Sequence, residues 1–205
     1  MSDPILDVIG VGNAIVDVLA KSDDAFLNTH DIPKGGMILA DDATAKTIYD
    51  AMGEAVEVSG GSAANSIACI ASLGGNPGFV GKVGEDALGE TFRHDLRALG
   101  VRFDTAPLRG GPDTGRCLIN VTPDAQRSMT TALGAAGYVS PDDIDDGFIQ
   151  SAAITYFEGY LFEQPVAREA FVKACAIARA AGRRTALTLS DVGLVERQFL
   201  SLIHI

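Results

Sequence analysis

The sequence predicts an α/β fold: a mostly parallel sheet with helices on both faces, plus a small β-sheet lid. Short apolar, β-rich runs alternate with segments of helical periodicity, as in a parallel sheet whose crossovers are helices. Two regions interrupt this alternation with consecutive strand-like runs. The composition, 47% hydrophobic and 21% charged over 205 residues, supplies a sizeable core and excludes a disordered chain.

The elements of the parallel sheet are predicted from periodicity and flanking glycines. The expected strands are Ile5–Val11, Val56–Val58, Gly78–Lys82, Ala153–Phe157 and Thr185–Leu189. The expected helices are Asp41–Met52, Ala63–Leu73, Ala87–Leu99 and Pro165–Ala181. Gly182 follows the last helix as a C-cap.

The lid is predicted from the two interruptions. The strand-like runs are Asp17–Lys21 and Met37–Ala40 around the helical Asp23–His30, then Val101–Thr105, Arg116–Thr122 and Ser128–Leu133. Only turns join the last three, so we expect antiparallel strands inserted at about 16–40 and 101–133. Such a sheet would stand off the main one as a lid. We expect residues 1–205 to form a single domain, incomplete at its carboxyl end because Leu194–Ile205 is an uncapped apolar helix.

Charge and apolar patterning exclude several classes of function. The formal net charge is −11, so most of the surface repels nucleic acids and anionic membranes. No run approaches the ~20 apolar residues of a membrane span, and no basic region of a secretory signal begins the chain. Cys69, Cys117 and Cys175 are too widely spaced for a zinc cluster or a disulfide framework. We therefore expect a cytoplasmic protein that binds neither nucleic acid nor membrane.

The first candidate site follows the first strand. Gly10 and Gly12 suggest a dinucleotide-binding fingerprint, but that pattern needs a small residue where Ile15 stands. It also needs a helix where we expect a strand. Asn13 and Asp17 instead lie near the carboxyl end of a parallel strand, where open α/β sheets bind ligands. A carboxylate there can accept hydrogen bonds from two neighbouring hydroxyls, although capping of local turns is the alternative.

The second candidate site joins a strand to a helix. Gly60 and Gly61 allow a ligand to approach a helix start, and Asn65, one turn later, offers a donor and an acceptor. An ordinary glycine-rich turn is the alternative. Ser62 nearly matches the G-x-S-x-G nucleophile elbow of α/β-hydrolases. Such an enzyme needs a histidine base, but His204 lies in the terminal apolar run and His94 on an amphipathic helix.

A third segment runs from Gly81 to Gly89. Two glycines follow a strand, and acidic residues then open a helix, which favours the helix dipole. Lys82 is not a phosphate-binding Walker lysine, because no G-x-x-x-x-G-K-[ST] pattern surrounds it. Alone, the segment indicates only an ordinary helix start.

Taken in order, the three segments resemble the ribokinase-like (PfkB) family of carbohydrate and nucleoside kinases. The matching residues are Gly12, Asn13, Asp17, Gly60, Gly61, Asn65, Gly81, Lys82, Val83, Gly84, Asp86 and Gly89. The resemblance covers about Ile5 to Ser190 and is closer to the adenosine-kinase branch than to ribokinase or fructokinase. It implies a Rossmann-like (ribokinase-like) main sheet with a small β-sheet lid.

The resemblance also implies a substrate site. Its residues would be Asn13, Asp17, Gly60, Gly61, Asn65, Arg116 and Tyr160. Asp17 and Asn65 would hold sugar hydroxyls, with Asn13 beside the first and the two glycines allowing the sugar to lie against the backbone. Arg116 would point at the substrate from a lid strand. Tyr160 matches the position where nucleoside-binding members place an aromatic side chain against the base.

Two family segments are absent from the sequence. These are the N-x-x-E segment that organises magnesium and the G-A-G-D segment that supplies the catalytic base. We therefore expect the amino-terminal part of an ATP- and Mg²⁺-dependent kinase, with the base beyond Ile205. The expected acceptor is the hydroxymethyl group of a sugar or nucleoside, adenosine first. The alternatives are a ribokinase- or fructokinase-type sugar kinase, a degenerate sugar- or nucleoside-binding protein, and the Ser62 hydrolase. A homodimer formed through the lid is a further expectation.

Overall fold

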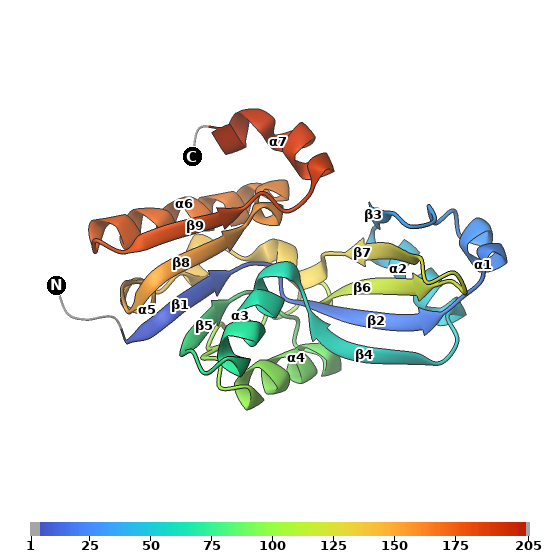
Figure 1. Ribbon diagram of the computed structural model, residues 1–205, viewed down its shortest axis with the longest axis horizontal. Coiled ribbons are helices and arrows are strands. Elements are labelled where there is room, and N and C mark those ends of the chain that lie inside the picture. Colours follow the sequence, from blue (N-terminus) through green and yellow to red (C-terminus); the bar gives the residue numbers. More distant parts are fainter. Residues whose placement is uncertain (1–4, 204–205) are drawn as a thin grey trace.

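The computed structural model describes residues 5–203 and contains two β-sheets (Figure 1). The strands of the main sheet are β1 (Leu6–Val11), β5 (Pro77–Val80), β8 (Ala152–Glu158) and β9 (Arg184–Thr188). Their order is β5-β1-β8-β9, and every neighbouring pair is parallel. The predicted parallel sheet is therefore confirmed.

Helices cover both faces of this sheet, as predicted. They are α3 (Ser62–Ser72), α4 (Ala87–Ala98), α5 (Asp146–Gln150) and α6 (Pro165–Ala180). Successive residues of β1 point to opposite faces, so its apolar run supplies two cores. Val8 packs with Ile67 of α3 and Phe92 of α4. Ile9 belongs to the other core, which contains Phe171 of α6.

The second sheet stands beside the main one, and the chain passes directly from β1 of the main sheet into β2 of the second (Figure 1). Its strands are β2 (Ile15–Lys21), β3 (Met37–Leu39), β4 (Ala55–Gly60), β6 (Gly115–Val121) and β7 (Arg127–Ala132). Their order is β3-β7-β6-β2-β4. The pairs β2–β6 and β3–β7 are parallel and the others antiparallel, so the sheet is mixed rather than purely antiparallel as expected.

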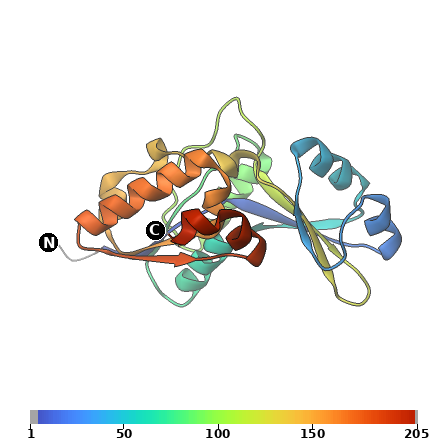
Figure 2. The same cartoon turned by 90° about the horizontal axis from the view of Figure 1, so that it is seen from above.

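Two short helices, α1 (Asp24–Thr29) and α2 (Asp42–Ala51), cover one face of the second sheet. Figure 2 shows these helices and the sheet together at one end of the molecule. Val18 of β2 and Leu118 of β6 face them and pack with Leu27 and Ile48. The opposite face carries Asp17, which is one residue out of phase with Val18.

Two predicted strands are wrong in place or type. Val56–Val58 lies in β4, which pairs antiparallel with β2 in the second sheet rather than joining the main sheet. Val101–Thr105 forms no strand, and only an isolated bridge joins Arg102 to Gly78. The reason is the same in both cases: a short apolar run carries no information about its partner.

The remaining elements of the described residues are three short 3₁₀ helices and one longer helix. They are the 3₁₀ helices η1 (Gly134–Tyr138), η2 (Pro141–Asp143) and η3 (Gly159–Glu163), and the helix α7 (Val192–Ile203). The sequence predicted only α7, as Leu194–Ile205, whose last two residues lie outside the described range.

Candidate functional site

The chain crosses between the two sheets near the carboxyl ends of β1 and β8. β1 leads into β2 through residues 12–14, and β4 leads into α3 through Gly61. These two connections touch: a Cβ atom on Gly61 would stand 2.5 Å from the carbonyl oxygen of Asn13. The first two predicted motifs therefore meet at the sheet edge where α/β proteins bind ligands.

Glu158, the last residue of β8, joins the two connections, and sequence reasoning did not select it. Its side chain is 1% exposed and accepts hydrogen bonds from the Asn13 N–H at 2.6 Å, the Ser62 hydroxyl at 2.6 Å and the Ala63 N–H at 2.9 Å. Burial raises the pKa of Glu158, although these hydrogen bonds lower it in part. Gly12 leaves room for the carboxylate, since a Cβ there would lie 2.8 Å from Glu158 Cδ.

Asp17 lies against Gly60 on the face of the second sheet opposite α1 and α2. A Cβ on Gly60 would be 2.5 Å from Asp17 Cγ, so only glycine leaves space for this carboxylate. Burial raises the pKa of Asp17, and the charge of Arg127 lowers it in part. Within residues 5–203 the Asp17 carboxylate accepts no hydrogen bond. It is therefore a half-buried acceptor whose lone pairs are free for a ligand.

Gly61 and Asn65 shape the start of α3. Gly61 has φ 96°, which favours glycine, and its carbonyl accepts the Asn65 N–H at 2.8 Å. The exposed Asn65 side chain borders a crevice of about 170 Å³ between β4, α3 and α4, together with Gly60 and Asp95. Asp17 does not line this crevice. The structure thus brings Asn13, Asp17, Gly60 and Gly61 together, and places Asn65 at the outer side of that group.

Arg116 and Asp17 lie on opposite faces of the second sheet. Asp17 pairs with Cys117 on β6, and successive strand residues alternate between faces. The Arg116 guanidinium lies over the ring of Tyr49 on α2, 5.8 Å from its centroid. The structure therefore does not bring Arg116 to the Asp17 carboxylate. The alternation of side chains along a strand predicts the face of Arg116 only if the pairing of β2 with β6 is known, and the sequence alone does not give that pairing.

Tyr160 lies just beyond β8, beside the connection from β9 to α7. Its backbone N–H donates to Ser190 Oγ at 3.3 Å, and its phenol lies next to the carboxylate of Asp191. Burial and this carboxylate raise the pKa of Tyr160. Asp191 also caps α7 by accepting the Leu194 N–H at 2.9 Å. Tyr160 therefore shares the sheet edge with Glu158 but makes its contacts on the β9 side.

The third motif is a structural link to the second sheet. Asp86 caps α4 by accepting the Gly89 N–H at 2.8 Å, and also accepts the Thr114 N–H at 2.6 Å and the Thr114 hydroxyl at 2.7 Å. Burial alone would raise the pKa of Asp86, but these hydrogen bonds outweigh it and lower the pKa. Thr114 directly precedes β6. Lys82, in turn, forms an ion pair with Asp143, with side chains 12% and 8% exposed.

The hydrolase alternative finds no support in the described residues. The Ser62 hydroxyl donates to Glu158, and neither described histidine contacts it. His94 is exposed beside Asp95, and the His30 ring packs at a tilt against Phe26. His204 lies outside the described residues. A serine nucleophile needs an adjacent base oriented by a third group, which is not present here.

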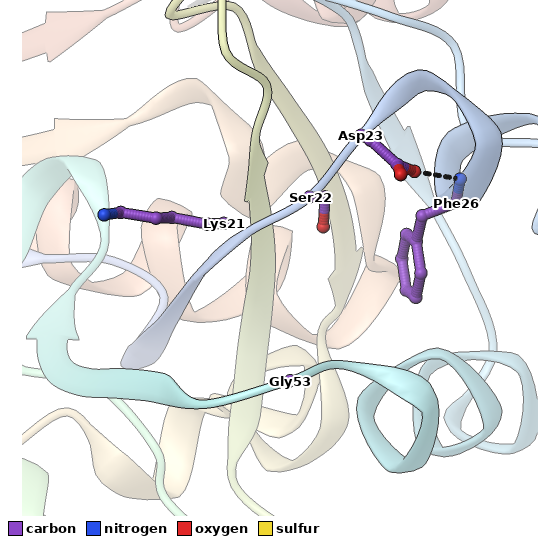
Figure 3. Close-up of a pocket in the computed structure, with 5 residues that line it drawn as sticks. All are labelled: Lys21, Ser22, Asp23, Phe26 and Gly53. Carbon is purple, nitrogen blue, oxygen red and sulfur yellow. Dashed lines mark hydrogen bonds between the residues drawn. The ribbon is translucent and has the colours of Figure 1, made fainter.

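A larger hollow lies away from this site. Its volume is about 330 Å³, and Figure 3 shows its lining residues at the far end of β2. They are Lys21, Ser22, Asp23, Phe26 and Gly53. The Asp23 carboxylate is already used, because it caps α1 by accepting the Phe26 N–H at 2.8 Å. None of these residues belongs to the predicted substrate site.

Metal and membrane signals are absent from the part of the chain that the structure describes. Residues 5–203 contain no group of three or more His, Cys, Asp or Glu side chains suited to a metal ion. They therefore do not fit Mg²⁺, which needs several oxygen ligands in near-octahedral geometry. None of the helices over the same residues is long and apolar enough to cross a bilayer. The cysteines Cys69, Cys117 and Cys175 are free thiols.

Comparison with known proteins gives one consistent family. The family model described as pfkB family carbohydrate kinase matches residues 37–204. The solved structure of adenosine kinase from Sinorhizobium meliloti is 50% identical with a TM-score of 0.90, covering 96% of this chain and 61% of that chain. A probable sugar kinase protein from Rhizobium etli CFN 42 is 43% identical with a TM-score of 0.92, covering 98% and 61%.

A curated relative matches a shorter stretch. The 5-dehydro-2-deoxygluconokinase of Shouchella clausii (strain KSM-K16) is 36% identical over 135 residues, which cover 63% of this chain and 41% of the relative. The chain therefore spans less than half of this curated relative and about three fifths of the two solved chains. Both adenosine and sugar kinases occur among the proteins that it resembles.

Proposed function

The chain belongs to the pfkB family of carbohydrate kinases, and from this premise we propose that the whole protein phosphorylates the hydroxymethyl group of a sugar or nucleoside, with adenosine favoured. The residues described here would supply most of the substrate site. Because the chain spans about three fifths of the two solved chains, activity, substrate and cofactors are proposed for the whole protein.

The Asp17 carboxylate is the observation that carries this proposal. Its side chain is half-buried, lies against a glycine, and accepts no hydrogen bond within residues 5–203. Leaving a buried carboxylate without partners is costly, so a ligand that donates to it gains a large share of its affinity there. Two neighbouring hydroxyls of a ribose match two carboxylate oxygens. Gly60 and Gly61 keep side chains away from that space.

The choice of adenosine rests on the relatives and on one aromatic residue. The Sinorhizobium meliloti structure, at 50% identity, is that of an adenosine kinase. Tyr160, at the sheet edge beside Glu158, offers a ring against which a base can stack. The sugar-kinase names among the relatives make a free sugar the second candidate.

ATP and Mg²⁺ are the cofactors that we expect for the whole protein. The described residues do not fit the metal, so no step is assigned to it. What this chain does is bind and orient: Asp17 would hold the hydroxyls while the glycine-lined start of α3 closes the other side. Phosphoryl transfer depends chiefly on such positioning and on charge stabilisation.

The test compares Asp17→Asn with Asp50→Asn in the whole protein. Asp50 is an exposed carboxylate on α2, 56% exposed, and serves as the matched control. Isothermal titration with adenosine, inosine, ribose and fructose should show adenosine as the tightest ligand. Losing two charge-assisted hydrogen bonds should weaken its binding about 100-fold in Asp17→Asn and not in Asp50→Asn. Equal affinity in Asp17→Asn and the wild type would overturn the proposal.

A further inference from the structure

Glu158 ties together the two connections that carry the chain between the sheets. One of its donors, the Asn13 N–H, lies in the passage from β1 to β2. The other two, the Ser62 hydroxyl and the Ala63 N–H, lie where β4 passes into α3. Glu158 itself ends β8, a central strand of the main sheet. A single carboxylate at the end of β8 therefore holds two segments that lie 145 and about 95 residues before it in the sequence.

The Glu158 carboxylate is buried and closely packed. Its side chain is 1% exposed, and a Cβ on Gly12 would approach its Cδ to 2.8 Å and its Oε2 to 2.9 Å. Both of its oxygens are used: Oε1 accepts from Asn13, and Oε2 from Ser62 and Ala63. Buried donors that lose such an acceptor are left unsatisfied, which is costly.

We propose that Glu158 is a positioning residue that fixes the second sheet relative to the main sheet, and so fixes Asp17 relative to Tyr160. Asp17 lies four residues beyond Asn13 on β2, and Gly60 lies two residues before Ser62 on β4. Tyr160 lies two residues beyond Glu158 itself. The substrate site proposed above is thus assembled from two bodies that meet at this carboxylate.

This role differs from substrate binding. Both carboxylate oxygens already serve protein donors, so Glu158 acts through Asn13 and the start of α3. Glutamine in place of Glu158 keeps the shape of the side chain. Its Nε2 group only donates hydrogen bonds, so it cannot replace the carboxylate oxygen that stood at the same position. At least one of the three hydrogen bonds must then be lost. The Ser62→Ala variant removes one donor alone and leaves the carboxylate intact.

The test measures amide exchange and ligand binding separately. In residue-resolved hydrogen exchange, the Asn13 amide, the Ala63 amide or both should exchange at least ~10-fold faster in Glu158→Gln than in the wild type, with a smaller effect in Ser62→Ala. The Leu118 and Thr130 amides in β6 and β7 should be unchanged. Glu163→Gln is the matched control, since Glu163 pairs with Arg197 rather than with either connection. Unchanged exchange at Asn13 and Ala63 would overturn the inference.

Adenosine affinity distinguishes a positioning role from a merely structural one, because a merely structural role would leave the affinity unchanged. This part of the test rests on the proposed function. Adenosine affinity should fall ~10-fold or more in Glu158→Gln under conditions where it remains folded, while Glu163→Gln binds as the wild type does. Faster exchange with unchanged affinity would show that Glu158 is structural only and would also overturn the inference. If the wild type binds no nucleoside or sugar, the proposed function fails, and the exchange arm still decides the role of Glu158. If Glu158→Gln does not fold, Ser62→Ala decides both arms.

Discussion

Gly61→Ala gives the sharpest test of the packing between the two connections. Gly61 has φ 96° and ψ 137°, a region that L-residues avoid, and a Cβ there would stand 2.5 Å from the Asn13 carbonyl oxygen. The backbone strain costs about 1–3 kcal/mol and the forced displacement a further ~1–3 kcal/mol. We expect a loss of about 3–4 kcal/mol in the free energy of unfolding.

Substitutions at two other glycines distinguish the cost of backbone strain from the cost of the collision with Asn13. Gly74 has φ 87° but nothing within 4 Å of an added Cβ, so Gly74→Ala should cost only the strain, about 1–2 kcal/mol. Gly53 has neither positive φ nor a neighbour within 4 Å, so Gly53→Ala should be neutral or stabilise by up to ~1 kcal/mol.

Urea unfolding of the three variants decides between strain and collision. With a slope of about 2 kcal/mol per molar urea, the midpoint of Gly61→Ala should fall by about 1.5–2 M and that of Gly74→Ala by less than ~1 M. If the two midpoints fall equally, the contact between Gly61 and Asn13 contributes nothing and the close approach of the two connections is refuted. If Gly53→Ala lowers the free energy of unfolding as much as Gly74→Ala does, backbone strain at positive φ does not explain the cost of these substitutions.

Two further predictions concern the link between α4 and β6. Asp86→Asn should lower the free energy of unfolding by about 1–3 kcal/mol, because an amide cannot accept all three hydrogen bonds from Gly89 and Thr114. The exposed control Asp50→Asn should change it by less than ~0.5 kcal/mol in the same urea titration. The pKa of Asp86 is lowered in the folded state, so its stabilisation is present above the ordinary value of 3.8 and is lost as the pH falls through the folded value. The difference between wild type and Asp86→Asn should therefore shrink between pH 7 and pH 3; a constant difference would contradict the assigned hydrogen bonds.

Much of the fold is readable in the sequence because its signals are local. Helical periodicity and caps predict α2, α3, α4 and α6 to within a residue or two at each end. The sheet to which a strand belongs is not a local property. Val56–Val58 precedes a glycine turn and a helix, as a main-sheet strand would, yet it forms an edge of the second sheet with Val56 64% exposed. Its partner β2 had to be known first.

The candidate site likewise contains residues that can be predicted from the local sequence and residues whose place depends on distant partners. Asp17, Gly60 and Gly61 can be predicted from the sequence because glycines and a carboxylate beside a strand end are visible in a few consecutive residues. Glu158 was visible only as an acidic residue after an apolar strand, and its partners lie about 100 and 145 residues away. The face on which Arg116 lies depends on its pairing with Val16, which no single strand reveals.

The glycines of the first motif are explained by close packing at the crossing rather than by a bound phosphate. A Cβ on Gly10 would stand 2.5 Å from Ile67 Cγ1, and one on Gly12 would stand 2.6 Å from the Cβ of Ala63. Both contacts are with α3, which lies across β1, and no helix follows Gly12 to present its N-terminus to a pyrophosphate. The same spacing that suggests a dinucleotide site therefore serves here to bring α3 and Glu158 against the end of β1. Asp17 owes its place to that approach, because β2 starts from the crossing that these glycines permit.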